Sequence, residues 1–335
     1  MLSRDEKYMR MCFALAKKGF GKVAPNPMVG CVVLDKDGNL ISKGYHKKYG
    51  ENHAERDALL KLKNNEAEGG TLYVNLEPCS HFGKTPPCVD LIIKHKLKRV
   101  VIGMKDVNPK VDGITKLKNA GIEVDFVLEE EARFLNRMFI KTMTEKMPYV
   151  VLKTASTMDG KIASKTGSSK WITSETARKE VYRMRKEFDC IMTSSNTVIA
   201  DNPSMQHNFK CILDKDLRTP KDAKIYQQGE IYIASKENTP LKDKQLDIEA
   251  VLKNLYSKGI YSVFVECGGT LAGSMLKDNL IDEVYQFIAP KILNDNNGLS
   301  CFNGADIKEI SQAKNLKIYE LKQIEKDILI KAIVL

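Results

Sequence analysis

Hydrophobic positions recur with two alternating periods along the first half of the chain. Short apolar runs, typical of buried strands, occur at 28–34, 71–76, 99–104 and 122–128. Segments in which apolar residues have helical spacing lie between and around them, at 8–15, 55–63, 89–95, 115–119 and 130–144. Because strands alternate with helices, the pattern predicts a mostly parallel sheet with helices on its faces.

The second half carries a further series of the same kind. Strands are predicted at 149–155, 190–192, 211–213, 230–234, 262–266, 283–288 and 327–335, and helices at 175–187, 248–258 and 271–279. Pro148 cannot continue the helix that precedes it, so a domain boundary is expected near residue 146. We therefore predict one α/β domain over 1–146 and a second over 147–335.

Composition and charge narrow the class of protein. The chain has 335 residues, is 43% hydrophobic and 29% charged, and does not resemble a disordered, collagen-like or coiled-coil protein. No apolar stretch reaches the ~20 residues of a membrane span, and the start lacks an apolar core of signal-peptide length. Eight cysteines in a chain of this size indicate buried thiols, so we expect a cytoplasmic protein. The net charge of +10 fits nucleic acid, an anionic membrane or phosphorylated small molecules equally well.

The most specific chemical motif is His53-Ala54-Glu55, followed by Cys79 and Cys88. One imidazole and two thiolates suit Zn²⁺, and three protein ligands leave a fourth position for water, as hydrolytic zinc sites require. Water on zinc becomes a hydroxide nucleophile near neutral pH. Glu55 is placed to move protons between that water and a departing amine, as the carboxylate of a zinc deaminase does without binding the metal.

The spacing of the cysteines leaves alternatives open. The general deaminase signature ends in P-C-x-x-C, whereas eight residues separate Cys79 from Cys88. A structural zinc site with His81 as a fourth ligand, or two unrelated thiols beside a surface histidine, would also account for these residues.

A weaker signal lies in the second half. The apolar segment 262–266 runs through Gly268 and Gly269 into a predicted helix. Paired glycines let a backbone approach a pyrophosphate at a helix N-terminus, although a tight strand-to-helix turn explains the same glycines without a ligand. The sequence contains no G-x-G-x-x-G, so a Rossmann fingerprint is absent.

Longer segments resemble a known family, the bifunctional riboflavin-biosynthesis deaminase/reductases. The segments that resemble its pyrimidine deaminase domain are 24–30 (APNPMVG), 44–46 (GYH), 50–55 (GENHAE) and 75–88 (NLEPCSHFGKTPPC). The insertion between the two cysteines is characteristic of that domain. Segments 153–163, 169–173, 197–203 and 212–214 resemble the reductase half, so the resemblance covers nearly the whole chain. It implies an α/β fold: an N-terminal cytidine-deaminase-like three-layer α/β/α domain and a C-terminal dihydrofolate-reductase-like α/β domain.

The resemblance also implies two reactions. The first domain would be a zinc-dependent hydrolase that converts 2,5-diamino-6-(5-phosphoribosylamino)pyrimidin-4(3H)-one to 5-amino-6-(5-phosphoribosylamino)uracil. The second would be an NADPH-dependent oxidoreductase that reduces the ribosyl group of this product to ribityl.

Residue roles follow from the same resemblance. Zinc is expected on His53, Cys79 and Cys88, with Glu55 as the catalytic proton donor. The pyrimidine substrate is expected at Asn26, His46, His81, Lys84, Asp106 and Asn108. NADPH is expected at Ala155, Trp171, Thr197, Asp201, Gly268, Gly269, Thr270, Leu271, Ala272, Gly273 and Ser274. The substrate of the reductase is expected at Ser169, Arg185, Met205 and Glu266.

Two segments depart from the family. The loop at 103–114 is about two residues short and has Val107 where proline is usual. Asn208 stands where the family has an arginine that fits a phosphate clamp, so either a neighbour such as Lys210 supplies the charge or phosphate is held more weakly. No sequence pattern indicates which side chain would bind the 2′-phosphate of the cofactor.

Two other classes of protein compete with this interpretation. A non-catalytic protein with a structural zinc is one, and a deaminase acting on nucleic acid is the other. The second would need aromatic residues interleaved with Lys and Arg, whereas the chain has one tryptophan and scattered lysines. We therefore expect a phosphorylated pyrimidine as partner, without nucleic acid or membrane, and the sequence leaves a homo-oligomer open.

Overall fold

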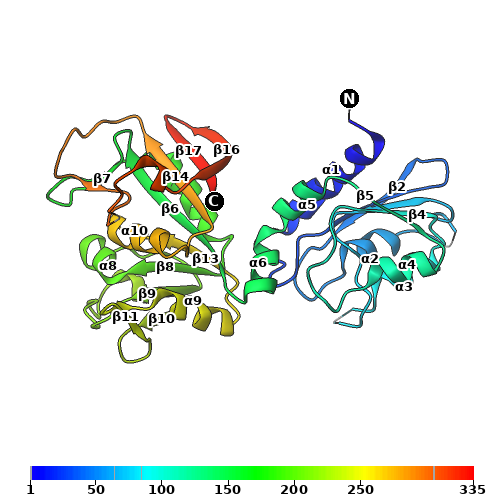
Figure 1. Ribbon diagram of the computed structural model, residues 1–335, viewed down its shortest axis with the longest axis horizontal. Helices are drawn as coiled ribbons and strands as arrows, with labels where there is room; N and C mark the ends of the chain where they lie inside the picture. The colour runs from blue at the N-terminus through cyan, green and yellow to red at the C-terminus, as the bar shows by residue number, and fades with distance from the viewer. Residues whose placement is uncertain (1, 64, 84, 305) are drawn as a thin grey trace. The chain divides into compact units, whose positions relative to one another are not determined.

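The chain folds as two compact units, Met1–Lys146 and Met147–Leu335 (Figure 1). The computed structural model describes all residues except 1, 64, 84 and 305. Each unit has its own sheet and its own hydrophobic core. Between the last helix of the first unit and the first strand of the second lie Lys146, which has a left-handed backbone, and Pro148. Among the described helices, none is long and apolar enough to cross a membrane.

The first unit is built on a five-stranded sheet with strand order β2-β1-β3-β4-β5. Strand β1 pairs antiparallel with β2 and β3, whereas β3, β4 and β5 run parallel. Its elements are α1 (Arg4–Ala16), η1 (Lys17–Gly19), β1 (Gly30–Leu34), β2 (Leu40–Tyr45), α2 (Ala54–Leu59), β3 (Thr71–Val74), α3 (Cys88–Lys94), β4 (Arg99–Ile102), α4 (Gly113–Asn119), β5 (Glu123–Phe126), α5 (Glu129–Leu135) and α6 (Arg137–Glu145).

Helices cover both faces of this sheet. Figure 1 shows α1 and α5 on one face and α2, α3 and α4 on the other. Because both faces are covered, every residue of β1 is buried, and the central strands are continuous apolar runs rather than alternating ones. The expected three-layer α/β/α arrangement is confirmed.

Two features of the first unit differ from the sequence prediction. Strand β2 has no apolar run because only Ser42 and Gly44 in it are buried, and its antiparallel pairing makes the sheet mixed rather than mostly parallel. The helix predicted at 130–144 is two helices, α5 and α6, interrupted at Asn136. The buried Asn136 side chain accepts a hydrogen bond from the Met28 N–H (2.9 Å) and donates one to the Met28 carbonyl (3.0 Å). The interruption thus fixes the loop that carries Asn26.

The second unit is built on an eight-stranded sheet with strand order β10-β9-β8-β13-β6-β14-β17-β16. The first six strands of that order run parallel, and β17 and β16 are antiparallel to their neighbours. The elements are β6 (Tyr149–Thr157), β7 (Lys161–Ala163), α7 (Glu175–Arg185), β8 (Cys190–Ser194), α8 (Ser195–Asp201), β9 (Phe209–Leu213), η2 (Lys224–Gln227), β10 (Glu230–Ala234), β11 (Leu241–Lys242), β12 (Gln245–Leu246), α9 (Ile248–Ser257), β13 (Ser262–Glu266), α10 (Gly269–Lys277), β14 (Glu283–Ala289), β15 (Leu299–Ser300), η3 (Ile310–Gln312), β16 (Leu316–Ile324) and β17 (Asp327–Val334).

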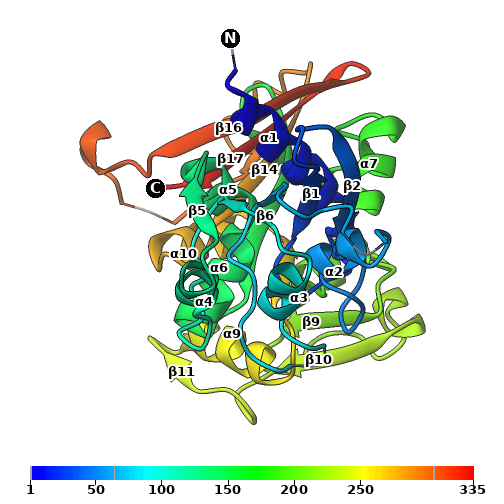
Figure 2. The ribbon, with the colours of Figure 1, turned by 90° about the vertical axis from the view of Figure 1, so that its right-hand side faces the viewer.

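Three helices of this unit, α7, α8 and α9, begin at residues whose side chains cap them. The side chains of Ser174, Ser194 and Asp247 accept hydrogen bonds from the first turns of α7, α8 and α9. Strand β16 forms a long hairpin with β17 at the end of the sheet (Figure 2). The hydrophobic pattern does not predict β16, because it is an edge strand and almost all of its residues are exposed or half-buried.

Candidate functional sites

Three ligand atoms converge in the first unit. Nδ1 of His53 lies 3.4 Å from Sγ of Cys79 and 3.5 Å from Sγ of Cys88, and all three atoms lie within 4.8 Å of one another. Tetrahedral zinc would hold neighbouring N and S ligand atoms roughly 3.6 Å apart, so this donor set fits zinc. His81 is outside the group, and no other cluster of this kind occurs within the described part of the chain.

The local fold brings these ligands together. His53 is the N-cap residue of α2, Cys79 follows β3, and Cys88 is the first residue of α3. The backbone N–H of Cys88 donates to Sγ of Cys79 (3.3 Å). The hydrogen bond from the Cys88 thiol lowers the pKa of Cys79, so a thiolate is available as a ligand.

Glu55 lies in the first turn of α2, beside these ligands. Its side chain is buried, and burial followed by the charge of Cys79 raises the pKa of Glu55 to about 7. A zinc ion would oppose this rise by stabilising the carboxylate. A buried carboxyl with a pKa near the working pH can both accept and return a proton.

Asn26 and His46 lie on one side of the cluster. The Asn26 amide nitrogen is 3.1 Å from Nε2 of His46, and Nδ1 of His46 is 3.0 Å from the Asn52 carbonyl. Because a carbonyl only accepts, Nδ1 carries the proton and Nε2 accepts from Asn26. The His46 ring stands edge-on to the His53 ring, with centroids 5.4 Å apart. The structure therefore places His46 against the metal ligand His53, and Asn26 against His46.

Asp106 and Asn108 lie on the short loop that departs from the family. The Asp106 carboxylate accepts from the Asn108 N–H (2.8 Å), and burial raises the pKa of Asp106 to about 6. Nδ1 of the half-buried His81 has no hydrogen-bond partner among the described atoms. Lys84, also predicted at this site, lies outside the described residues.

The sequence prediction missed two side chains that support this site. The buried Glu77 carboxylate accepts from the backbone N–H groups of Asp106 (3.1 Å), Gly113 (2.8 Å) and Ile114 (3.1 Å), so it holds the short loop. The buried Asn75 accepts from Gly30 N–H (2.7 Å) and donates to the Met28 carbonyl. Both residues fall within the quoted N-L-E-P-C segment, which is the only sign of them in the sequence.

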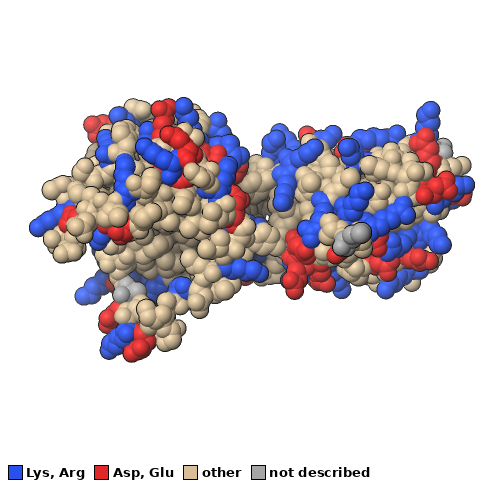
Figure 3. Space-filling view, turned by 90° about the horizontal axis from the view of Figure 1, so that it is seen from above, with Lys and Arg blue, Asp and Glu red and all other residues tan. Residues whose placement is uncertain are grey.

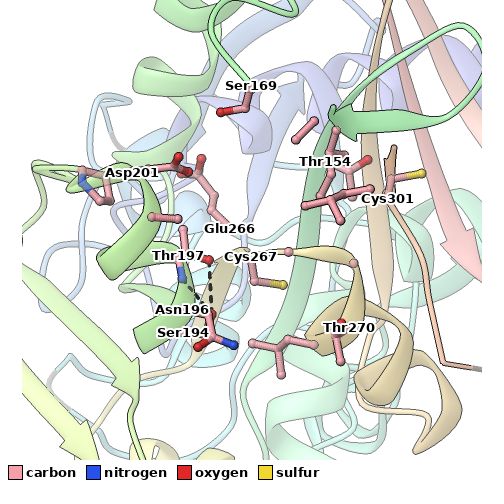
Figure 4. Close-up of a pocket in the computed structure, with 18 of the residues that line it drawn as sticks. Thr154, Ser169, Ser194, Asn196, Thr197, Asp201, Glu266, Cys267, Thr270 and Cys301 are labelled. Carbon is pink, nitrogen blue, oxygen red and sulfur yellow. Dashed lines mark hydrogen bonds between the residues drawn. The ribbon is translucent and has the colours of Figure 1, made fainter. Parts of the chain in front are cut away.

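The second unit contains a cavity of about 1340 Å³. It lies at the carboxyl ends of β6, β8, β9 and β13, where open α/β sheets bind ligands. Figure 4 shows Asp201 and Glu266 facing Thr154 and Cys301 across it. The predicted residues that line it are Ala155, Ser169, Trp171, Arg185, Thr197, Asp201, Met205, Glu266, Gly268, Gly269, Thr270, Leu271 and Ser274. Its size suits a dinucleotide together with a second ligand.

Ala272 and Gly273, also predicted at the cofactor, are not among the residues that line this cavity. Both are buried within α10, and a Cβ on Gly273 would lie 1.8 Å from the Asn303 carbonyl oxygen. Because only one side of a helix faces a ligand, the residues of a continuous seven-residue segment cannot all contact it.

Asn208 and Lys210 are also outside the lining of the cavity. The Lys210 amine is fully buried and donates to the carbonyls of Ile225 and Gln228, so it does not supply the charge missing at Asn208.

An ion-pair network around the buried Glu266 lines the cavity. Glu266 is 8% exposed and pairs with Arg185, whose Nη2 is 3.0 Å away, and with Lys153 at 3.4 Å. Burial alone would raise the pKa of Glu266, but Lys153 and Arg185 outweigh it and lower that pKa to about 2. The carboxylate is therefore ionised and held in place. Lys153 lines the cavity and has no role in the sequence prediction.

Trp171 is a surface residue of the cavity rather than a core residue. Its side chain is 63% exposed, and the Arg178 guanidinium lies over its ring at 4.1 Å from the centroid. An exposed indole that is held by a cation offers a flat apolar face to a ring-shaped ligand.

Comparison with known proteins identifies the family. Residues 148–330 match the RibD C-terminal domain, and residues 2–104 match the cytidine and deoxycytidylate deaminase zinc-binding region. The chain is 41% identical to the riboflavin biosynthesis protein RibD of Aquifex aeolicus, over 97% of both chains. The chain belongs to the RibD family. It is a bifunctional deaminase and reductase of riboflavin biosynthesis that uses zinc and NADPH.

Other RibD proteins are similar over the same extent. The Escherichia coli RibD is 36% identical, over 97% of this chain and 98% of that protein. The crystal structure of the Thermotoga maritima diaminohydroxyphosphoribosylaminopyrimidine deaminase/5-amino-6-(5-phosphoribosylamino)uracil reductase has a TM-score of 0.87 at 37% identity and covers 99% of both chains. Acinetobacter baumannii RibD has a TM-score of 0.86 at 36% identity, also over 99% of both chains. The dihydrofolate-reductase-like fold expected for the second RibD domain is confirmed with the rest of the fold.

Proposed function

We propose that Met1–Lys146 deaminates 2,5-diamino-6-(5-phosphoribosylamino)pyrimidin-4(3H)-one and that Met147–Leu335 reduces the ribosyl group of the product to ribityl. The observation that carries the first assignment is the convergence of His53, Cys79 and Cys88 beside the buried Glu55. The assignment of the reductase to the second unit is supported by the cavity at the carboxyl edge of the larger sheet.

In the first unit, His53, Cys79 and Cys88 would hold the zinc. Zinc supplies a nucleophile from water at neutral pH. Glu55 takes the proton from the attacking water and delivers it to the departing amine. Asn26, with its amide oriented by neutral His46, and Asp106 bind the edges of the pyrimidine ring, because a heterocycle is recognised by directional donors and acceptors.

In the second unit, Gly268 and Gly269 lead into α10 and allow the pyrophosphate of the cofactor to approach its N-terminus. NADPH supplies the hydride. Arg185 and Lys153 are held in place by their ion pairs with Glu266, so they are suited to bind a polar, phosphorylated substrate. Trp171 and Ala155 position the flat end of the cofactor.

The proposal includes a cytoplasmic location and no nucleic acid or membrane as partner. Figure 3 shows lysine and arginine side chains mixed with carboxylates over one face of both units, not gathered in one continuous stripe. The face seen in this view offers no extended track for a polyanion.

The direct test is incubation of the purified protein with the diaminopyrimidine substrate, with products identified by mass. Without NADPH, we expect release of ammonia and accumulation of the deaminated ribosyl compound. With NADPH, we expect the ribityl compound and an equal amount of oxidised cofactor. Absence of ammonia release, or the same end product with and without NADPH, would contradict the proposal.

A further inference from the structure

Two cations line a part of the second-unit cavity that the proposed chemistry does not use. Lys215 and Arg218 follow β9, whereas the groups assigned to the substrate are Arg185 and the β6–β13 pair Lys153 and Glu266. In the sheet, β9 is separated from β6 by β8 and β13. Adjacent strands are ~4.8 Å apart, so the two cations stand about 14 Å along the sheet edge from β6.

The distance between β6 and β9 indicates which end of the cofactor lies near which strand. The nicotinamide must lie beside the substrate, near β6 and β13, for hydride transfer to occur. With its pyrophosphate at Gly268 and Gly269 after β13, the other half of the molecule extends across β8 toward β9. That half carries the adenine and the ribose whose 2′-position distinguishes NADPH from NADH.

The turn after β9 presents Arg218 rigidly. The buried Asp214 accepts from the backbone N–H groups of Arg218 (2.9 Å) and Thr219 (2.8 Å). The guanidinium Nη2 donates to Oδ1 of Asn196 (2.6 Å) and to Oγ of Ser195 (3.3 Å). These partners are neutral, and no carboxylate of the described residues forms an ion pair with Arg218. Its charge is thus held at the cavity without a carboxylate in direct contact among the described residues.

Lys215 adds a second positive charge. Its ammonium lies 3.7 Å from the Asp216 carboxylate and donates to the Lys244 carbonyl (3.2 Å). Asp216 is also paired with Lys236 at 3.1 Å, so the carboxylate is shared between two lysines. The group formed by Lys215, Asp216, Arg218 and Lys236 therefore has a net charge of +2, and the first three residues line the cavity.

We propose that Arg218 and Lys215 bind the 2′-phosphate of NADPH and so select NADPH over NADH, an inference that rests on the proposed cofactor site. A phosphate monoester matches the guanidinium fork and the point charge of a lysine, whereas the 2′-hydroxyl of NADH offers a neutral partner. Dinucleotide sites use an arginine in the same way for the 2′-phosphate and an acidic residue for a free 2′-hydroxyl. Leu246, Ile248 and Leu271 line the same cavity and supply an apolar surface for adenine.

The test measures equilibrium binding of NADPH, NADH and adenosine 2′,5′-bisphosphate to the full-length protein by calorimetry. For Arg218→Ala, we expect NADPH and the bisphosphate to bind roughly 10-fold to 100-fold more weakly, as the loss of a charge-assisted contact implies, while the affinity for NADH changes less than about threefold. Arg218→Lys should recover part of the loss, and Lys215→Ala should cause a smaller loss of the same selectivity. Lys221→Ala removes a charge at an exposed position outside the cavity lining and should change none of the three affinities.

The possible results distinguish failure of this inference from failure of the proposed function. Equal weakening of NADPH and NADH in Arg218→Ala, or no change in either, would overturn the assignment of the 2′-phosphate and leave the proposed function standing. A wild-type protein that binds neither dinucleotide would contradict the proposed function and this inference together.

Discussion

The metal cluster of the first unit and the cavity of the second are assembled on different scales. His53, Cys79 and Cys88 place three atoms within 4.8 Å, and a backbone hydrogen bond from Cys88 to Cys79 joins two of the ligand residues directly. The cavity instead collects side chains from four parallel strands and the loops that follow them. A shift of one ligand therefore affects the whole metal site, whereas a single substitution in the cavity removes only one part of the ligand-binding free energy.

The strongest test of this difference is removal of the metal. Dialysis against a chelator should reduce deamination to below about 1% of its initial rate, because the nucleophile is generated only with zinc in place. Oxidation of NADPH with the deaminated compound as substrate should stay within twofold, since the cavity lies wholly in the second unit. Deamination should return on addition of Zn²⁺. Parallel loss of both activities would contradict the independence of the two sites.

The second prediction concerns the single proton carrier. Glu55→Gln keeps the shape of the side chain but cannot transfer a proton, so we expect the kcat of deamination to fall by roughly 10²–10⁴-fold. Zinc content, measured by metal analysis, should not change. Glu68→Gln, an exposed residue of the same unit, is the matched control and should behave as wild type. A Glu55→Gln protein that retains normal kcat would exclude Glu55 as the proton carrier.

The third prediction compares stability in the second unit. Glu266→Gln would leave the half-buried cations Lys153 and Arg185 without a counter-ion, and we expect a loss of roughly 1–3 kcal/mol in free energy of unfolding, below the cost for a fully buried pair. The native pKa of Glu266, about 2, lies below its ordinary value of 4.5. The carboxylate therefore stabilises the fold fully above pH 4.5, and this contribution is lost as the pH falls toward 2.

Urea unfolding of wild type and Glu266→Gln at several pH values measures this effect. The difference in midpoint should be largest at neutral pH and should shrink between pH 4.5 and 2. The unfolding transition of the first unit is the internal control and should be the same in both proteins. A difference that is independent of pH would show that the carboxylate charge is not the cause.

The contrast between the metal cluster and the cavity explains which site residues could be predicted from the sequence alone. The ligands are visible in the sequence because a metal site restricts residue type and short spacing, and His53, Glu55, Cys79 and Cys88 meet as that pattern indicates. Most cavity residues are predicted only by the family resemblance. Lys153, Arg218 and Glu77 carry no local pattern, because the contacts that give them a role come from segments far apart in the chain.

The fold shows a similar division. Strands such as β10 and β13 match their predicted ranges because they are apolar runs bounded by turns. Strands β2 and β16 have few buried residues, so no apolar run marks them. The break at Asn136 depends on a hydrogen bond to Met28, which lies 108 residues away in the chain and is invisible to local periodicity.

A fourth prediction probes the support of the first site. Glu77→Gln removes the negative charge that accepts hydrogen bonds from Asp106, Gly113 and Ile114. Because the loop then loses charge-assisted contacts, the KM of deamination should rise roughly tenfold, with a smaller change in kcat. Glu77→Ala should raise KM further. A fall in kcat with unchanged KM would point instead to a role in the chemical step.

The smallest effect is expected at Asn208, where the family has arginine. Asn208 precedes β9 and therefore lies at the amino end of that strand, whereas the cavity lies at the carboxyl ends. Asn208 is exposed and outside the lining, so Asn208→Arg places its charge in solvent, and the KM of the reductase for its substrate should change by less than about twofold. Lys221→Ala, a charge change at another exposed position, gives the background variation. A tenfold lower KM in Asn208→Arg would mean that the long side chain reaches the phosphate from the amino end, and the cavity would then extend farther along β9 than its present lining.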